Sequence, residues 1–257
     1  MEAINKTIRV FAPASSANLG CGFDVMGMAL DGIGDVLRIA ISEGDGLTIR
    51  NASAAELPKD IEKNVITPAV RAFMAAAGKK ACLEIVVEKK IRPGSGIGSS
   101  AASSAAAVFG LNELYGRPFP LPELVPFAME GEKLISGTAH ADNSAPAVMG
   151  GIVLIRGYQP LDMVRLPVPD SFCFSVIHPH IVVSTKAARD VLRKEIPMHE
   201  AVIQWGNVGG LVAGIMTGDL PLIGRSMRDV VAEPYRKGFI PGYDDLKSAC
   251  LSAGALC

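Results

Sequence analysis

One stretch of the sequence constrains the fold more than any other: a glycine-rich turn that joins an apolar segment to an alanine-rich one. Residues 83–89 contain three consecutive β-branched residues and predict a buried strand. Residues 93–100 then place three alternating glycines before two serines. Residues 101–115 are rich in alanine, which has the highest helix propensity, so a helix is expected. The chain therefore predicts a strand, a tight turn and a helix in direct succession.

The turn at residues 93–100 has the properties of an anion-binding loop. Glycines allow the backbone to adopt positive φ and to approach a ligand closely. The start of a helix leaves unpaired N–H groups and a positive dipole end, and both favour phosphate. The predicted nucleotide-binding residues of this turn are Pro93, Gly94, Ser95, Gly96, Ile97, Gly98, Ser99 and Ser100.

Two common phosphate-binding motifs do not fit this turn. A Walker A loop requires Gly-Lys-Ser/Thr, which does not follow here. A Rossmann turn follows the first strand and has an acidic residue about 20 positions later, whereas Glu113 comes too early and lies in the expected helix. A tight turn in which a serine caps the helix remains the alternative.

The remaining segments favour an α+β fold. Residues 7–12, 36–41, 47–50, 150–156 and 172–178 read as strands, and residues 13–22 and 137–145 read as loops. Helices are expected at residues 65–77, 123–135, 185–195 and 201–217. Strands and helices interleave without a regular βαβ rhythm, which argues against a doubly wound sheet. Three prolines at residues 160–170 suggest a boundary there, which predicts domains at 1–160 and 161–257.

Composition excludes several classes of protein. There are 25 basic and 26 acidic residues, so the basic excess of a nucleic-acid-binding protein is absent. No uncharged apolar stretch reaches 18 residues, which argues against a membrane span. The five cysteines are scattered and form no C-x-x-C pair, so neither a zinc site nor a disulfide framework is indicated. A reduced, cytoplasmic compartment fits this pattern.

Four stretches of the sequence resemble the GHMP small-molecule kinases. Residues 93–102, PGSGIGSSAA, resemble the phosphate loop of that family. Residues 12–24, 137–146 and 233–243 resemble motifs of its homoserine kinase branch. The resemblance implies transfer of the γ-phosphoryl of ATP, with Mg²⁺, to the hydroxyl of homoserine. Another GHMP kinase, acting on mevalonate or a sugar, is one alternative. A nucleotide-binding protein without turnover is another.

The resemblance also implies a fold and an assembly. It implies an N-terminal domain related to ribosomal protein S5 domain 2 and a ferredoxin-like C-terminal domain, with ATP in the cleft between them. Homodimers are common among such enzymes. The family carries a third glycine-rich motif, commonly introduced by a phrase like the Ala-Gly-Ala-Leu of residues 253–256. We therefore expect the C-terminal domain to be incomplete at Cys257.

The same resemblance implies roles for individual residues. Ser100 and Glu132 would hold Mg²⁺, with Glu130 as the neighbouring alternative to Glu132. The implied homoserine pocket consists of Asn18, Asp24, His140, Asn143, Thr185, Arg189 and Arg236. Asp24 suits the substrate's ammonium, and the planar guanidinium groups suit its carboxylate. Asn64 and Lys89 are weaker candidates for the adenosine end of ATP. On sequence grounds alone, each of these residues could be an ordinary surface, cap or turn residue.

The catalytic set implied in this way is Asn143, Arg189, Ser100 and Glu132. Some GHMP kinases have an aspartate base in the pocket, and Asn143 stands in that neighbourhood here. Asp142 is adjacent, and alternation along a loop would direct its side chain elsewhere. We therefore expect the substrate hydroxyl to lose its proton directly to the transferring phosphate.

Overall fold

The computed structural model describes residues 6–54, 57–169, 172–177, 181, 183 and 185–257. The N-terminal part contains, in chain order, β1 (Lys6–Ala17), β2 (Met26–Ser42), β3 (Gly46–Asn51), the short 3₁₀ helix η1 (Ile61–Lys63), α1 (Ile66–Ala76), β4 (Cys82–Glu88), α2 (Ser99–Leu114), α3 (Leu121–Ser136), α4 (Ala141–Met149), β5 (Ile152–Tyr158) and β6 (Leu161–Leu166). The C-terminal part contains α5 (Thr185–Asp190), α6 (Met198–Thr217), α7 (Leu220–Ser226), α8 (Glu233–Arg236), η2 (Lys237–Phe239) and α9 (Tyr243–Ser252).

One mixed sheet organises the N-terminal part. The strand order is β3-β4-β2-β5-β6, and β1 pairs with β2 outside this path. All pairings are antiparallel except the parallel pair of β3 and β4. Strand β2 is long enough to pair with β4 through its second half and with β5 through its first three residues. The predicted α+β class is confirmed.

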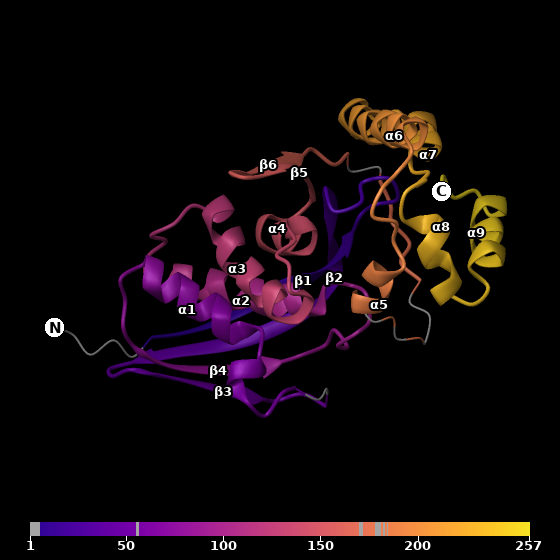
Figure 1. Cartoon of the computed structure of the whole chain (residues 1–257). Coiled ribbons are helices and arrows are strands. Elements are labelled where there is room, and N and C mark those ends of the chain that lie inside the picture. The colour runs from indigo at the N-terminus through magenta and orange to yellow at the C-terminus, as the bar shows by residue number, and fades with distance from the viewer. Residues whose placement is uncertain (1–5, 55–56, 170–171, 178–180, 182, 184) are drawn as a thin grey trace.

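The sheet has one buried and one solvated face. In β4, Leu83, Ile85 and Val87 are buried, and the residues between them point away, as expected for side chains that alternate along a strand. Helices α1 to α4 gather on the buried side (Figure 1). The opposite face carries charged side chains, including an ion pair of 3.3 Å between Arg50 and Glu84. This division explains the alternating pattern of the strands.

Helix α2 lies at the centre of the N-terminal layer of helices. It contacts β1 and β2 on one side and α1, α3 and α4 on the others. Most of its residues are buried, because its many alanine, serine and glycine residues are small and let neighbouring elements approach it from every direction. An aromatic cluster of Phe73, Phe119 and Phe127 closes the core beside α2, with ring centroids 5.3 to 5.7 Å apart.

The C-terminal helices form a separate group at one end of the molecule, beyond α5 (Figure 1). Helix α6 packs against α7. Asp229 accepts hydrogen bonds from three backbone amides before and within α8, and Gln204 of α6 donates to both Asp229 and the Cys21 carbonyl. Gln204 thereby ties the C-terminal helices to the loop that follows β1.

Most of the predicted elements are confirmed. The helices expected at residues 65–77, 101–115, 123–135 and 201–217 are α1, α2, α3 and α6. The strands expected at residues 7–12, 36–41, 47–50, 83–89 and 150–156 lie in β1 to β5.

Two predicted loops are wrong in part. Residues 13–22 were expected to be a loop, but β1 continues to Ala17 because its residues keep pairing with β2. Residues 137–145 were also expected to be a loop, but α4 begins at Ala141, whose side chain is buried with that of Ala145. Pairing and burial outweigh the polar composition in both segments.

Two predictions in the C-terminal part are also wrong. Residues 172–177 form no strand, and Phe174, Val176 and Ile177 are exposed, because no described strand pairs with them. His178, the last residue of that prediction, lies outside the described residues. The helix expected at residues 185–195 ends at Asp190, where the chain turns.

The predicted domain boundary lies inside a hairpin. Strand β6 begins at Leu161, and it pairs with β5 from Tyr158 opposite Leu161 to Ile152 opposite Leu166. The hairpin therefore crosses the predicted boundary at residue 160. The division into domains 1–160 and 161–257 stays a prediction.

Candidate active site

The glycine-rich turn joins β4 to α2 as predicted. Gly94, Gly96 and Gly98 have φ values of 78°, 78° and 66°. Residues that carry a Cβ atom rarely adopt this left-handed conformation. A Cβ on Gly98 would lie 2.0 Å from the Ser15 hydroxyl oxygen and 2.9 Å from Oδ1 of Asn143. Glycine is thus required at position 98 by both its backbone conformation and its surroundings.

Helix α2 begins without a side-chain cap. Gly98 is its N-cap residue, and no side chain accepts a hydrogen bond from the first turn at this cap. The alternative of a serine N-cap is therefore wrong. Ser99 Oγ instead donates to the Ile91 carbonyl at 3.4 Å. The first-turn amides of α2 keep the anion-binding character expected of a helix start.

The end of β1 brings Asn143 to the turn. Ser15 donates its backbone N–H to the Ile97 carbonyl at 3.2 Å, and its hydroxyl donates to Oδ1 of Asn143 at 2.9 Å. Asn143 lies in the first turn of α4. Its amide therefore stands beside the glycine-rich turn, as the assigned role requires.

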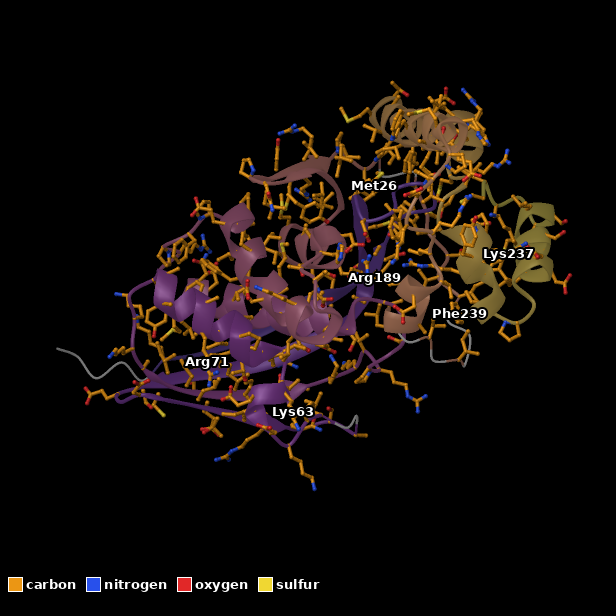
Figure 2. The ribbon with its side chains drawn as sticks, viewed as in Figure 1. Met26, Lys63, Arg71, Arg189, Lys237 and Phe239 are labelled. Atoms are coloured by element: carbon orange, nitrogen blue, oxygen red, sulfur yellow. The ribbon has the colours of Figure 1, made fainter. Side chains whose placement is uncertain are left out.

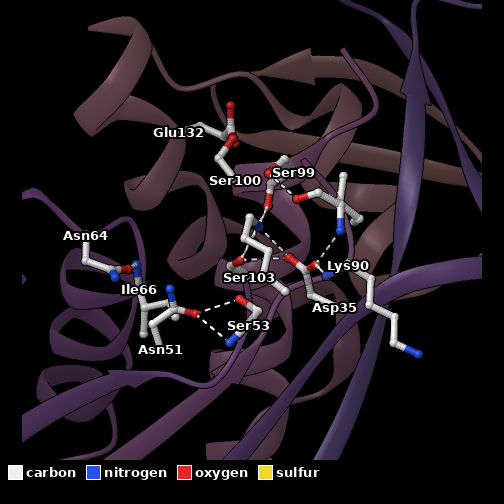
Figure 3. Close-up of polar contacts among 12 residues, drawn as sticks. Asp35, Asn51, Ser53, Asn64, Ile66, Lys90, Ser99, Ser100, Ser103 and Glu132 are labelled. Atoms are coloured by element: carbon white, nitrogen blue, oxygen red, sulfur yellow. Dashed lines mark hydrogen bonds and ion pairs between the residues drawn. The ribbon is translucent and has the colours of Figure 1, made fainter. Parts of the chain in front are cut away.

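Ser100 and Glu132 meet across α2 and α3. The Ser100 hydroxyl donates a short hydrogen bond to Oε1 of Glu132 (Figure 3). Burial raises the pKa of Glu132, and the bond from Ser100 opposes that rise. Glu130 is half exposed and pairs with Lys133 at 3.8 Å on the outer face of α3. Glu132, and not Glu130, therefore faces the site.

A cavity of about 460 Å³ connects most of the predicted nucleotide residues. Its lining includes Pro93, Gly94, Gly96, Gly98, Ser99, Ser100, Glu132, Asn143, Asn64 and Lys89. Leu57, Pro58 and Val65 add an apolar wall that the sequence did not reveal. Asn64 is buried, and its Oδ1 accepts the Ile66 N–H at 3.0 Å, which fixes the start of α1.

Lys89 is not the surface residue that the sequence suggested. Its side chain is only 3% exposed. The ammonium donates to Oδ2 of Asp35 at 2.5 Å, to the Ser99 carbonyl at 2.8 Å and to Ser103 Oγ at 2.9 Å. Burial lowers the pKa of Lys89, and the Asp35 carboxylate opposes this effect. These acceptors match the three protons of an ammonium, which leaves none to donate to a nucleotide.

A second group of predicted residues gathers around Asp24. Arg189 donates to both Asp24 carboxylate oxygens, from Nη1 at 3.1 Å and from Nη2 at 2.9 Å. Arg189 lies between the sheet and the C-terminal helices (Figure 2). Asn18 accepts the Asp24 backbone N–H through Oδ1 at 2.9 Å. Both Asn18 and Asp24 have positive φ, of 71° and 58°, an uncommon conformation that clusters at binding sites.

Two polar atoms in this group are buried without a hydrogen-bond partner among the described residues: Nδ1 of His140 and Nε of Arg189. His140 Nδ1 lies 3.6 Å from the Asp24 carboxylate. Burial lowers the pKa of His140, and the negative charge of Asp24 opposes that. Because unsatisfied buried groups are costly, a polar ligand that reached them would be bound favourably.

The two predicted arginines lie over one aromatic ring. The guanidinium carbons of Arg236 and Arg189 lie 4.9 and 5.8 Å from the centroid of Phe23. Burial lowers the pKa of Arg236, and the charge of Arg189 lowers it further. Two cations held this close attract an anion. The role of Phe23 was missed, although it precedes Asp24 in one of the matched motifs.

A smaller cavity of about 250 Å³ connects Arg236 to the glycine-rich turn. It is lined by Gly94, Ser95 and Gly96, and Val183 lines both cavities. Thr185, the remaining predicted pocket residue, begins α5, but its side chain lies outside those that the structure describes. The two groups of predicted residues are therefore neighbours.

Asp142 faces the charged group, against expectation. Because residues 141–149 form a helix, the alternation assumed for a loop does not apply. Asp142 is buried, and burial raises its pKa to about 7, helped by the charges of Asp24 and Glu132. Tyr158 closes this side: its hydroxyl donates to the Asp24 carbonyl at 2.8 Å and accepts the Ala141 N–H at 3.3 Å. From the sequence, the side chain of Asp142 was considered but expected elsewhere, and Tyr158 was not indicated.

Known proteins match the chain over almost its full length. Residues 64–151 match the family model of the GHMP kinases N-terminal domain. Homoserine kinases from Chlorobium phaeovibrioides and Natronomonas pharaonis are 46% and 43% identical, covering 98% and 96% of this chain and 82% and 81% of those proteins.

Solved structures agree with these sequence matches. The crystal structure of homoserine kinase from Cytophaga hutchinsonii is 47% identical with a TM-score of 0.91, covering all of this chain and 82% of that one. A mevalonate kinase from L. major, at 16% identity and a TM-score of 0.67, shares the fold, covering 98% of this chain and 82% of that one. The chain therefore belongs to the homoserine kinase branch of the GHMP kinase family.

Proposed function

We propose that this chain transfers the γ-phosphoryl group of ATP to the hydroxyl of L-homoserine and forms O-phospho-L-homoserine, a step of threonine biosynthesis. One observation carries the proposal. The Asp24 carboxylate pairs with Arg189, which lies over the Phe23 ring together with Arg236. Arg236 also lines a cavity with residues of the glycine-rich turn, whose helix start suits phosphate. The homoserine kinases that match over nearly the whole chain support the same reaction.

The nucleotide would occupy the larger cavity. Its triphosphate would accept hydrogen bonds from the amides of residues 94–100, where the helix dipole favours negative charge. The adenosine end would pack on the apolar wall formed by Leu57, Pro58 and Val65, with Asn64 nearby. Positioning of this kind supplies much of the catalysis in phosphoryl transfer, because the protein performs little covalent chemistry.

Ser100 and Glu132 fit a magnesium ion. A hydroxyl and a carboxylate are hard oxygen ligands of the kind that Mg²⁺ takes, usually together with water and phosphate oxygens. Partial burial raises the pKa of the Glu132 carboxyl, and a cation beside it would favour its ionised form. When bound, Mg²⁺ neutralises phosphate charge. Ser100 and Glu132 would hold it next to the first turn of α2.

The charged pocket would orient homoserine. Asp24 would accept the ammonium group, and Arg189 and Arg236 would bind the carboxylate. In the structure Arg189 already pairs with Asp24, so the zwitterion would exchange one ion pair for two. Asn143, held beside the turn by Ser15, would orient the hydroxyl toward the phosphate.

We propose that the hydroxyl proton passes directly to the transferring phosphate. Asp142 is the competing acceptor, because a carboxyl with a pKa of about 7 suits a general base. The Asp142→Asn variant distinguishes the two routes. A variant that folds and keeps kcat within about tenfold supports direct transfer, whereas a loss of about a thousandfold would identify Asp142 as the base.

The cellular setting is part of the proposal. No helix among the described residues is long and apolar enough to cross a membrane. We propose a cytoplasmic homodimer that binds no nucleic acid or membrane, in keeping with a net charge of −1. Light scattering after size-exclusion chromatography tests the oligomeric state: the mass of a single chain would contradict the dimer.

A substrate panel tests the reaction. The purified chain would be incubated with ATP, Mg²⁺ and either homoserine, mevalonate or galactose, and the product identified by phosphorus NMR. Phosphohomoserine is the expected product. Phosphorylation of mevalonate but not homoserine would point to another GHMP kinase. ATP binding by calorimetry without any product would point to a nucleotide-binding protein without turnover.

A further inference from the structure

Asp35 is a fully buried carboxylate that the proposed chemistry does not use. It lies in the middle of β2, and its side chain is 0% exposed. Oδ1 accepts the backbone N–H groups of Lys90 and Ile91, each at 3.0 Å. Oδ2 accepts from Lys89 Nζ at 2.5 Å and from Ser103 Oγ at 3.0 Å (Figure 3). Every one of these partners lies next to the glycine-rich turn.

Lys89 extends the contact to the other end of the turn. Its ammonium also donates to the Ser99 carbonyl, at 2.8 Å, in the first turn of α2. Lys90 and Ile91 lie just before the glycine-rich turn, and Ser99 is the first residue of α2, directly after Gly98. One carboxylate on the sheet therefore fixes both ends of residues 92–98, directly at the entry and through Lys89 at the exit.

A buried ion pair of this kind is not explained by stability alone. Removing two charges from water is costly, and replacing such a pair by apolar residues of similar volume is often neutral or stabilising. A glycine-rich segment, in turn, loses more conformational entropy on ordering than other sequences do. Fixing both of its ends would order the loop before a ligand arrives, which improves binding.

We propose that Asp35 and Lys89 are positioning residues for ATP, which hold the entry and exit of residues 92–98 at the spacing that directs the loop amides toward the phosphates. The proposal rests on the proposed binding of the triphosphate at this turn. Because the pair is neutral as a whole, it acts by geometry and adds no charge to the site.

The double variant Asp35→Asn with Lys89→Met tests the proposal. It removes both charges at similar volume, so no lone charge is left buried. We expect the KM for ATP to rise about tenfold or more, since small displacements of a binding loop are costly. The KM for homoserine should stay within about twofold, because the hydrogen bonds described for the pair involve neither Asp24 nor Arg189 nor Arg236. In the nucleotide-free protein, the amides of Lys90 and Ile91 should exchange hydrogen faster.

Asn112→Ala is the matched control, because it weakens the opposite end of the same helix. The buried Asn112 side chain donates to the Phe119 carbonyl at 2.9 Å and accepts the Phe119 N–H at 3.1 Å. This variant should lower Tm while leaving the KM for ATP and the exchange at Lys90 and Ile91 unchanged. A purely structural role for Asp35 and Lys89 would give the double variant the same behaviour and would overturn the proposal.

If the double variant does not fold, the single variant Ser103→Ala tests the same proposal. Alanine suits this helix, and the change removes one donor to Asp35 and one acceptor from Lys89. A rise of about threefold in the KM for ATP is expected, with faster exchange at the same two amides. Wild-type values of both would refute the proposal. Failure of the proposed function is separate: it would appear as a wild-type chain without homoserine phosphorylation, whereas the exchange measurement needs no substrate.

Discussion

Asp24 and Arg189 lie 165 residues apart in the chain and form the best-defined ion pair of the candidate substrate pocket. The pair is bidentate, which a guanidinium achieves because its donors are planar and fixed in direction. Arg189 also lies over the Phe23 ring. Both features depend on the shape of arginine and not merely on its charge.

Replacing Arg189 by lysine should therefore impair the pocket. An ammonium keeps the charge but loses the fork and the stacking, so we expect the KM for homoserine to rise about 30-fold or more. The KM for ATP should stay near its wild-type value, since Arg189 does not line the nucleotide cavity. Steady-state kinetics with each substrate varied in turn would check this, and an equal rise in both constants would contradict the assignment.

Tyr158 gives a second test at the scale of a single residue. Its hydroxyl connects the Asp24 carbonyl to the Ala141 amide, and burial raises its pKa to about 12, so it stays protonated at neutral pH. Tyr158→Phe should lower the free energy of unfolding by about 1 kcal/mol. It should raise the KM for homoserine a few-fold by loosening the loop at Asp24. Calorimetry and kinetics together check this, and a wild-type KM would limit Tyr158 to a structural role.

At the scale of elements, the turn between β4 and α2 matters most. Its conformation follows from glycine, because Gly94, Gly96 and Gly98 all have positive φ. Its position follows from β1, β2 and α4, which supply Ser15, Asp35 and Asn143. The turn is thus locally encoded but held by contacts from distant segments.

Two glycines that flank α2, Gly98 before it and Gly116 after it, distinguish the effect of backbone conformation from the effect of distant contacts. Gly98 and Gly116 both have positive φ, of 66° and 79°, but a Cβ on Gly116 meets nothing within 4 Å. Gly116→Ala should cost about 1 kcal/mol of stability through backbone strain alone. Gly98→Ala should carry that strain and also displace Ser15 and Asn143.

We therefore expect Gly98→Ala to abolish ATP binding in a calorimetric titration, and Gly116→Ala to keep it. Thermal melts of both variants would show whether the fold survives. If a folded Gly98→Ala protein bound ATP as tightly as the wild type, the phosphate-loop assignment would be wrong.

For the whole molecule, packing forces an acidic residue into the interior. The first turn of α4 lies so close to β2 that a Cβ on Gly27 would overlap the Asp142 carbonyl oxygen. Asp142 is consequently buried near Asp24 and Glu132, and its pKa rises from 3.8 to about 7. The folded protein therefore holds a proton that the unfolded chain releases above pH 4 or so.

This proton makes stability depend on pH. Because the pKa of Asp142 is higher in the folded state, its effect is absent below about pH 4 and grows as the pH rises to about 7, where it destabilises the fold by roughly 4 kcal/mol at most. The substitution Asp142→Asn removes this pH-dependent destabilisation. The variant should melt at a higher temperature than the wild type at pH 8 and close to it at pH 4.5. An equal difference at both pH values would contradict the raised pKa.

The sequence by itself determined the local elements of this protein. The apolar alternation of β4, the glycines of the turn and the alanines of α2 act over a few residues, so a single stretch reveals them. The resemblance to known motifs then indicated Ser100, Glu132, Asn143, Asp24 and both arginines. The structure brings these residues into two neighbouring groups.

Only the tertiary structure decided which side chains are buried and which charges meet. Lys89 reads as a surface residue, yet Asp35, 54 positions earlier, holds it inside. Asp142 reads as part of a loop, yet α4 turns it toward the pocket charges. Residues 172–178 read as a strand, yet no described strand pairs with residues 172–177. Burial, pairing and pKa depend on contacts between distant segments, and local sequence preferences do not contain that information.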